Sequence, residues 1–441
     1  MALRLAYRFL LPLVFTIASV IVAQTSGAEN NDELRAVVIL ARHGVRAPIE
    51  SETRSNAFNA QPWPTWPVEP GRLTPHGIDA LKRMGEFYRQ RYASLLTGPD
   101  PCPLKVAAYS TDTPRTIASA KATLSAVVPN CTIDVHADLS QDPPTIDRAR
   151  LADAVNGRMA NQPAWFENAF AAPLAEMHSI LTTCASSSKA CIPNKPDFRT
   201  TMLQTGSTQP GMNQSAASTY GTLVPRDSRK ENAVTPGADF AENFLLQYVE
   251  GMPLDQVGWG RVSRPTLDRL MEMNTRYHDF MLRTPYYAQQ AAGPLAQQIS
   301  AILKAKAHET ESGVHITTSP DMPPFFFFSA HDANLTWMGG LLRMDWMVSD
   351  EIFNATPPGS ALVFELHHNK QTSADTVRVL FIAQTLAQIR NLTPLTGDEH
   401  PSIAPIYIPN CSGPGPDYAC SLEDFARIVA NASGSATPTP R

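Results

Sequence analysis

The stretch LRAVVILARHGVRAP (residues 34–48) joins a mostly apolar run to a cluster of cationic side chains. The run at 34–40 is short and β-branched in its middle, which predicts a strand buried on both faces. Arg42, His43 and Arg46 follow where this strand should end. Like charges this close together repel one another, so the cluster indicates that an anion binds between them.

The segments around this stretch alternate between strand and helix patterns. Strand patterns lie at 105–111, 132–137, 323–331, 360–368 and 377–384, and helix patterns at 73–96 and 114–128. Strands that alternate with helices indicate parallel pairing with helical crossovers. We therefore predict an α/β fold with a mainly parallel sheet flanked by helices.

The middle of the chain has a different pattern. Between 146 and 319 the strand patterns stop, and amphipathic helices are predicted at 238–252 and 264–282. The simplest architecture is an α/β domain made of residues 29–145 and 320–432. A large, mainly helical inserted domain, residues 146–319, would interrupt it.

The N-terminus has the pattern of an export signal. Arg4 and Arg8 precede an apolar run at 10–23, and small residues follow. This order is typical of a cleaved signal peptide, which we place at 1–28. A single transmembrane anchor is the alternative, but the run is shorter than the roughly 20 apolar residues that a spanning helix needs. We expect a periplasmic or secreted protein with no membrane association after cleavage, and a disordered tail at 433–441.

The cysteines fit an oxidising compartment. Cys184 and Cys191 are close in sequence, as are Cys411 and Cys420, while the remaining two, Cys102 and Cys131, flank a predicted strand–helix unit. An even number of cysteines in an exported chain predicts disulfides, here three. Because CxxC spacing is absent, we expect neither a zinc site nor redox catalysis, and no metal or cofactor.

Polar clusters follow three of the predicted strands, at 41–46 (ARHGVR), 110–115 (STDTPR) and 329–334 (SAHDAN). The carboxyl ends of parallel strands meet at one edge of a sheet, where α/β proteins bind their ligands. We therefore expect all three clusters to line one pocket. Together they supply Arg42, His43, Arg46, Arg115, His331 and Asp332.

These side chains have the chemistry of phosphoryl transfer. Guanidinium and imidazole groups hydrogen-bond the non-bridging oxygens of a phosphoryl group. A histidine in line with phosphorus, here His43, can attack it and form a phosphohistidine. A carboxylic acid, here Asp332, can protonate the leaving alkoxide, which favours an acidic pH optimum. The net charge of −5 argues against a nucleic-acid partner but not against a small phosphate ester.

RHGVRAP together with a downstream His-Asp pair resembles the histidine acid phosphatases, branch 2 of the histidine phosphatase superfamily. The blocks at 244–262 and 331–342 resemble the bacterial periplasmic members, which include phytases and glucose-1-phosphatases. The resemblance implies a phosphoglycerate mutase-like sheet and a metal-independent phosphomonoesterase. It makes His43 the nucleophile and Asp332 the proton donor. It assigns the phosphate-binding role to Arg42, Arg46, Arg115 and His331.

The resemblance leaves the substrate open. Phytases of this branch carry a threonine and a lysine where this chain has Ile49 and Glu50, and an anionic Glu50 would disfavour a polyphosphate. Glu242 falls where those phytases have a substrate-contacting glutamate. The block at 247–260 also resembles the glucose-1-phosphatase version. We predict hydrolysis of phytate-type or sugar phosphate monoesters, with a sugar phosphatase of little phytase activity as the alternative.

Other interpretations compete with this prediction. His43 could be a structural histidine between paired arginines, Arg115 could only cap a helix, and Glu242 could be a plain helix-face charge. A phosphate-ester binding module without turnover would need no acid on a separate strand. A mutase of the same superfamily would not need an export signal. We expect a monomer that acts on small-molecule phosphate monoesters.

Overall fold

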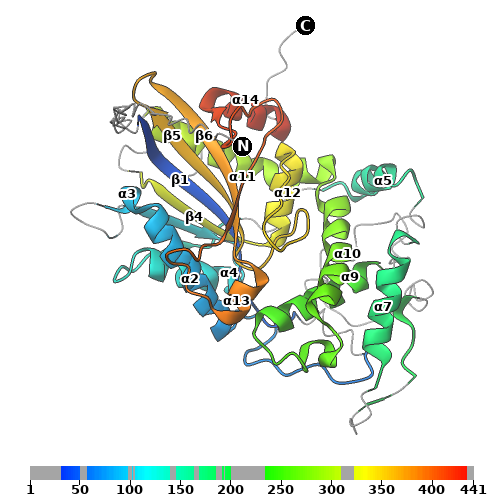
Figure 1. Cartoon of the computed structure of the whole chain (residues 1–441). Coiled ribbons are helices and arrows are strands. Elements are labelled where there is room, and N and C mark those ends of the chain that lie inside the picture. The colour runs from blue at the N-terminus through cyan, green and yellow to red at the C-terminus, as the bar shows by residue number, and fades with distance from the viewer. Residues whose placement is uncertain are drawn as a thin grey trace, which may run out of the picture.

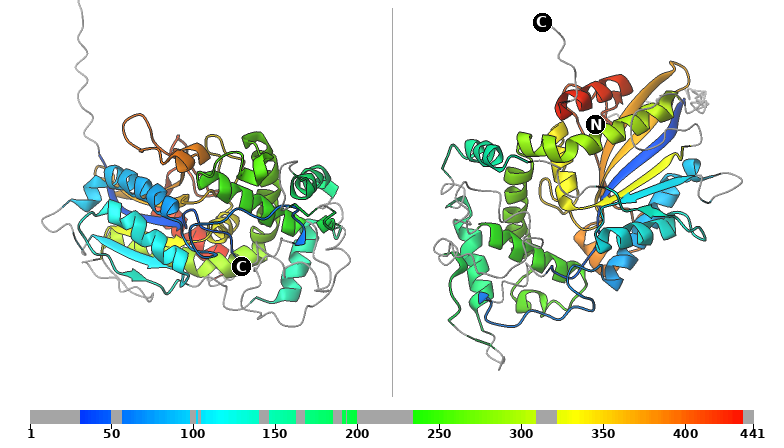
Figure 2. Two further views of the ribbon diagram at one scale, coloured as in Figure 1. Left: turned by 90° about the horizontal axis from the view of Figure 1, so that it is seen from below. Right: turned by 180° about the vertical axis from the view of Figure 1, so that it is seen from behind.

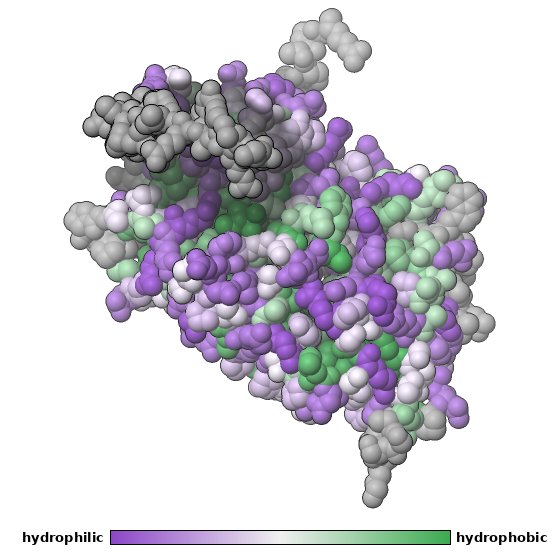
Figure 3. Space-filling model, in the orientation of Figure 1, coloured by the Kyte–Doolittle hydropathy of each residue, from purple (hydrophilic) through white to green (hydrophobic). Residues whose placement is uncertain are grey.

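The computed structural model describes residues 31–49, 57–97, 102, 105–139, 146–162, 168–184, 191–192, 194–199, 234–308 and 322–434. The predicted signal peptide, Glu50 and the predicted tail from 435 onward lie outside these ranges. Within them, no helix combines the length and apolar character that a bilayer crossing requires. Hydrophobic and hydrophilic patches alternate on the face seen in Figure 3.

The described strands form one eight-stranded sheet in the order β3-β2-β4-β1-β5-β6-β7, with β8 paired to β6 (Figure 1). The strands are β1 (Asp32–Arg42), β2 (Val106–Ser110), β3 (Val135–His136), β4 (Phe325–Ala330), β5 (Ala361–Asn369), β6 (Ala374–Ala383), β7 (Ser402–Pro405) and β8 (Cys420–Ser421). The α/β class predicted from the sequence is thereby confirmed.

Parallel pairing holds for one half of this sheet only. Strands β3, β2, β4 and β1 pair in parallel, whereas β5, β6, β7 and β8 join by antiparallel pairing. The sheet is therefore mixed rather than mainly parallel. The physical reason is the connection between β5 and β6, residues 370–373, which is long enough for a hairpin but far too short for a helical crossover.

Strand β1 is buried on both faces, as its composition predicts. Val38 and Leu40 belong to a core shared with helices α11 (Pro285–His308), α12 (Asp332–Leu342) and α14 (Leu422–Ser433). Val37 and Ile39 belong to a second core shared with α2 (Pro75–Arg91) and α4 (Pro114–Val127). Alternate side chains of a strand point to opposite faces, so one strand supplies both cores. Figure 1 shows these helices on either side of the sheet.

Helices α2 and α10 (Arg264–Leu282) begin at a capping residue that is followed by a proline in the first turn. Thr74 precedes α2 and accepts a hydrogen bond from the Gly77 amide at 2.9 Å, and Ser263 caps α10 in the same way. The sheet is flanked by α2 (Pro75–Arg91), α3 (Ala93–Leu96), α4 (Pro114–Val127), α11 (Pro285–His308), α12 (Asp332–Leu342) and α14 (Leu422–Ser433), whereas α13 (Leu386–Asn391), which follows β6, packs on α9 (Val234–Val249).

A helical region lies beside the sheet (Figure 2). It contains α5 (Arg148–Arg158), α7 (Ala171–Thr182), α9 (Val234–Val249), the 3-10 helix η3 (Val257–Gly260) and α10 (Arg264–Leu282). Helices α9 and α10 pack on each other, whereas α11 packs on α14, α12 and β1. This packing groups α11 with the helices that cover the sheet. The domain limits drawn from the sequence stay a prediction.

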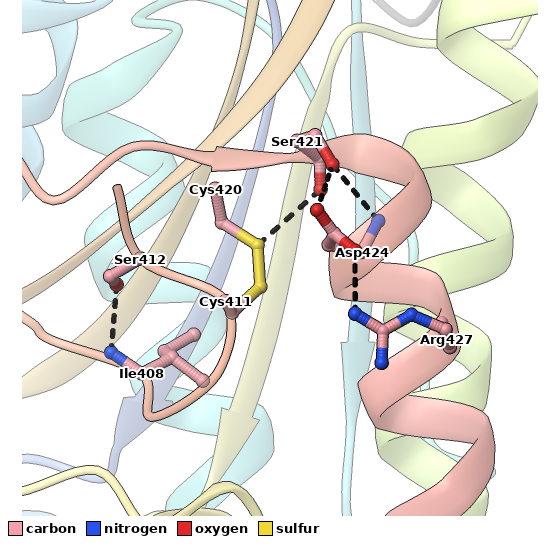
Figure 4. The surroundings of a disulfide bond; sticks show 7 residues. All are labelled: Ile408, Cys411, Ser412, Cys420, Ser421, Asp424 and Arg427. Atoms are coloured by element: carbon pink, nitrogen blue, oxygen red, sulfur yellow. Dashed lines mark hydrogen bonds and ion pairs between the residues drawn. A yellow bond between two sulfur atoms is a disulfide. The ribbon is translucent and has the colours of Figure 1, made fainter. Parts of the chain in front are cut away.

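The three disulfides predicted from the sequence are present: Cys102–Cys131, Cys184–Cys191 and Cys411–Cys420. Figure 4 shows the last of them beside the start of α14, where the Ser421 hydroxyl accepts from the Asp424 amide at 3.1 Å. A disulfide stabilises a fold mainly by restricting the unfolded chain. Here it ties the loop after β7 to the N-terminus of the last helix.

Candidate active site

The ends of β1, β4 and β2 lie side by side, and they bring the three predicted polar clusters together. Arg42 is the last residue of β1 and pairs with Ala330 at the end of β4. The next amide, that of His43, donates to the Ala330 carbonyl at 2.9 Å, and the Thr111 amide donates to Ser329 at 3.2 Å. Parallel pairing therefore assembles the cluster from segments nearly 300 residues apart.

His43 is 2% exposed, and one hydrogen bond determines its tautomer. Its Nδ1 lies 2.8 Å from the carbonyl oxygen of Gly44. A carbonyl oxygen only accepts, so Nδ1 carries the proton and the lone pair is on Nε2. Ser119 of α4 holds the loop by accepting from the Gly44 amide at 3.1 Å. The ring is thus fixed with a nucleophilic nitrogen opposite Nδ1.

His331 has the opposite tautomer. Its ring lies 5.5 Å from that of His43, centroid to centroid, at 71°. Arg115 Nη2 lies 3.2 Å from Nδ1 of His331. Because a guanidinium can only donate, Nδ1 is the acceptor of this hydrogen bond. The proton is therefore on Nε2, which donates to the Thr111 hydroxyl at 3.0 Å. Arg115, at the start of α4 after β2, and His331, between β4 and α12, therefore lie side by side at the ends of neighbouring strands.

Burial and positive neighbours keep both histidines neutral. Burial lowers the pKa of His43 well below its ordinary value, and the charges of Arg115, Arg42 and Arg46 lower it further. The same effects, burial first and Arg115 next, lower the pKa of His331 to about 3. At mildly acidic pH the lone pair on Nε2 of His43 is consequently available for attack.

Arg42 lies between two carboxylates. Its Nη2 forms an ion pair with Oε1 of Glu242 and is 3.2 Å from Oδ2 of Asp332. Glu242 comes from α9, so this contact joins the helical region to the end of β1. Glu242 is buried, which excludes the alternative that it is a plain surface charge on its helix.

Asp332 is the first residue of α12, directly after His331 at the N-cap. Burial alone would raise the pKa of Asp332, but the positive charge of Arg42 outweighs it. The pKa is therefore lowered. Asp332 is ionised in the free protein, and an anion bound at Arg42 would raise its pKa by offsetting that charge.

The structure describes the other candidates less completely. Arg46 is buried, pairs with Leu73 through a β-bridge, and contributes its charge to the environment of His43. Ile49 lies beside Gly71, on the loop that pairs with residues 71–73. Glu50 lies outside the described residues. A substrate-binding role for Ile49 and Glu50 stays a prediction.

Two residues near the cluster were not identified from the sequence. His278 of α10 is near enough for the charges of Asp332 and Glu242 to act on it, and burial lowers its pKa. Glu351 lines a pocket that also includes Arg42 and Asp332. Neither lies in a motif or at a predicted strand end, so no sequence signal marks them. The described residues contain no group of three or more His, Cys, Asp or Glu side chains arranged to hold a metal ion.

Buried arginines, a nucleophilic imidazole and a carboxylate at the strand ends of an α/β sheet define a phosphoryl-transfer site. The family model of the histidine phosphatase superfamily (branch 2) matches residues 33–382. The chain belongs to this family.

The similar proteins cover nearly the whole chain. Phytase AppA of Escherichia coli (strain K12) is 30% identical over 429 residues, 93% of this chain and 94% of that protein. A glucose-1-phosphatase of Salmonella typhimurium is 24% identical over 426 residues, 95% of this chain and 96% of that protein. The solved structure of Hafnia alvei phytase in complex with tartrate has a TM-score of 0.74 at 30% identity, covering 92% of this chain and 98% of that chain. As a family member, the chain is a hydrolase of phosphate monoesters that acts through a phosphohistidine intermediate.

Proposed function

We propose that this protein is an exported acid phosphatase in which His43 is the nucleophile and Asp332 the proton donor. The observation that carries the proposal is the hydrogen bond from His43 Nδ1 to the Gly44 carbonyl, which leaves the lone pair on Nε2. Disulfides between all six cysteines support export to the periplasm or beyond the cell.

In the first step, Nε2 of His43 attacks phosphorus and the bond from phosphorus to the alcohol oxygen breaks. The alcohol oxygen leaves with the electron pair and takes a proton from Asp332. In the second step, water attacks phosphorus and gives its proton to Asp332, and the phosphorus–nitrogen bond breaks. The electron pair returns to His43, and inorganic phosphate is released.

Arg42, Arg46, Arg115 and His331 would bind the non-bridging oxygens. Arg115 donates to Nδ1 of His331 at 3.2 Å, so of the two ring nitrogens only Nε2, which donates to the Thr111 hydroxyl at 3.0 Å, has a proton that a phosphate oxygen could accept. These groups are fixed before substrate arrives, which is how preorganised charge stabilises a phosphoryl-transfer transition state.

Asp332 must gain a proton before it can give one. Its pKa is lowered mainly by Arg42, against the effect of burial, and a phosphate oxygen on Arg42 would weaken that influence. A phosphate monoester also enters as a monoanion at acidic pH and brings a proton of its own. Both effects favour activity below neutrality.

The substrates are proposed to be phosphate monoesters of the kind named in the relatives, phytate-type or sugar phosphates. A sugar phosphatase with little phytase activity is the second candidate. The observation in its favour is that Ile49 and Glu50 stand where phytases of this branch carry a threonine and a lysine. Side-by-side rates on phytate, glucose 1-phosphate and simple monoesters would distinguish the two.

The direct test uses His43→Ala and a radiolabelled phosphate ester. The purified protein should hydrolyse p-nitrophenyl phosphate in the pH range of about 4 to 6, which is set by carboxylate chemistry. Acid-stopped reactions should trap label on the unchanged chain and none on the variant. If the unchanged protein shows no turnover, the enzyme proposal is wrong and the protein is a binding module. If label is trapped on His43→Ala, another residue is the nucleophile.

A further inference from the structure

A pocket lies between the candidate active site and α10 and is lined by residues of both. Its lining includes Arg42 and Asp332 together with Glu351, Asp268, Asn274 and Thr275. His43 does not line this pocket. The pocket therefore adjoins the proposed proton donor but not the proposed nucleophile. The alcohol part of a substrate must lie on this side of the phosphoryl group.

Glu351 has an unusual environment within the pocket. Its side chain is 7% exposed, and its Oε1 has no hydrogen-bond partner among the described residues. The nearest cationic group is Nη2 of Arg264, at 3.5 Å. Burial raises the pKa of Glu351 to about 7, so it is a neutral carboxyl at acidic pH and can both donate and accept a hydrogen bond. A buried polar atom without a partner is costly, and a ligand hydroxyl would remove that cost.

The arginines that adjoin the pocket already form ion pairs with carboxylates. Arg264 is 2.7 Å from Asp268 and 3.5 Å from Glu351. Arg42 pairs with Glu242 and Asp332. Among the described residues that line the pocket, these contacts leave no lysine and no arginine without acidic neighbours. A second phosphate in this pocket would meet carboxylates, whereas an uncharged hydroxyl would meet matching donors and acceptors.

We propose that this pocket receives the alcohol part of the substrate and that Glu351 hydrogen-bonds one of its hydroxyl groups. Glu351 is thus a specificity-determining residue that favours monoesters of neutral polyhydroxy alcohols. The inference rests on the proposed function, because it needs Asp332 beside the leaving oxygen.

The test compares glycerol 2-phosphate with isopropyl phosphate, which share a carbon skeleton and differ only in two hydroxyl groups. The ratio of KM for isopropyl phosphate to KM for glycerol 2-phosphate measures what the hydroxyl groups contribute. Loss of one hydrogen bond should lower this ratio by about threefold to tenfold in Glu351→Leu. Glu351→Gln, which still donates and accepts, should keep a ratio close to that of the unchanged protein.

Glu272→Leu is the matched control, since it makes the same change at a glutamate of α10 whose side chain is 59% exposed and which does not line the pocket. It should leave the ratio unchanged. If Glu351→Leu does not fold, Thr275→Val removes another hydrogen-bonding group from the same wall and should lower the ratio. An unchanged ratio in the folded variants would overturn the pocket assignment. Failure of the unchanged protein to hydrolyse either ester would instead overturn the proposed function.

Discussion

His43 and His331 show how single hydrogen bonds decide chemistry at the scale of a residue. Both are buried histidines at strand ends, yet a carbonyl fixes the proton of one on Nδ1 and a guanidinium fixes that of the other on Nε2. Only His43 has a lone pair on Nε2. The residue types could be predicted from the sequence, but the positions of the protons could not, because they depend on partners contributed by the fold.

Asp332→Asn tests the role of the carboxyl. The amide cannot supply a proton to the leaving oxygen, so kcat/KM for an alkyl phosphate should fall by about 10²-fold or more. p-Nitrophenyl phosphate has a good leaving group that needs little protonation, and its kcat/KM should fall far less. Steady-state rates on both esters give the comparison. Equal losses on the two esters would remove Asp332 from the role of proton donor.

At the scale of elements, the start of α2 is fitted closely to the loop that follows β1. Thr74 caps the helix with its hydroxyl, and its backbone amide donates to the Val45 carbonyl at 3.0 Å. Gly77 lies so near that a Cβ atom there would be 2.2 Å from the same carbonyl oxygen. A side chain at this position must push the helix away from the loop that carries His43 and Arg46.

Gly77→Ala should therefore destabilise the protein by about 1–3 kcal/mol and lower kcat/KM, because the clash is with backbone. Denaturant unfolding and turnover of p-nitrophenyl phosphate measure the two effects. Gly157→Ala in α5 is the matched control, since nothing lies within 4 Å of its Cβ. The control should be neutral or slightly stabilising. A Gly77→Ala protein as stable and active as the control would contradict the packing argument.

At the scale of the whole molecule, hydrogen bonds between residues far apart in the sequence connect the helical region to segments of the α/β part. Glu250, just after α9, accepts from the Thr74 hydroxyl at 2.6 Å. Arg390 of α13 donates to the carbonyls of Tyr248 and Met252 at 2.6 and 2.7 Å. Burial raises the pKa of Glu250 from 4.5 to about 7. One of these connecting hydrogen bonds therefore involves a carboxyl, that of Glu250, which titrates near neutrality.

This titration predicts how stability depends on pH. Between pH 4.5 and 7 the folded protein binds more protons at Glu250 than the unfolded chain does, so the free energy of unfolding falls as pH rises. Thermal midpoints should decline across this window, and Glu250→Gln should flatten the decline. Glu69→Gln, at an exposed position, is the control and should keep it. A slope unchanged by Glu250→Gln would exclude this carboxyl as the cause.

The sequence by itself determined the phosphoryl-transfer chemistry, the α/β class and the pairing of the cysteines. Each depends on local patterns: RHGVRAP after an apolar strand, strands alternating with helices, and cysteines close in sequence or around one strand–helix unit. The tertiary structure alone decided the antiparallel half of the sheet, the ion pair between Arg42 and Glu242, and the presence of Glu351 in the pocket. These features depend on which distant segments of the chain contact each other, and such contacts cannot be predicted from composition or from the spacing of residues.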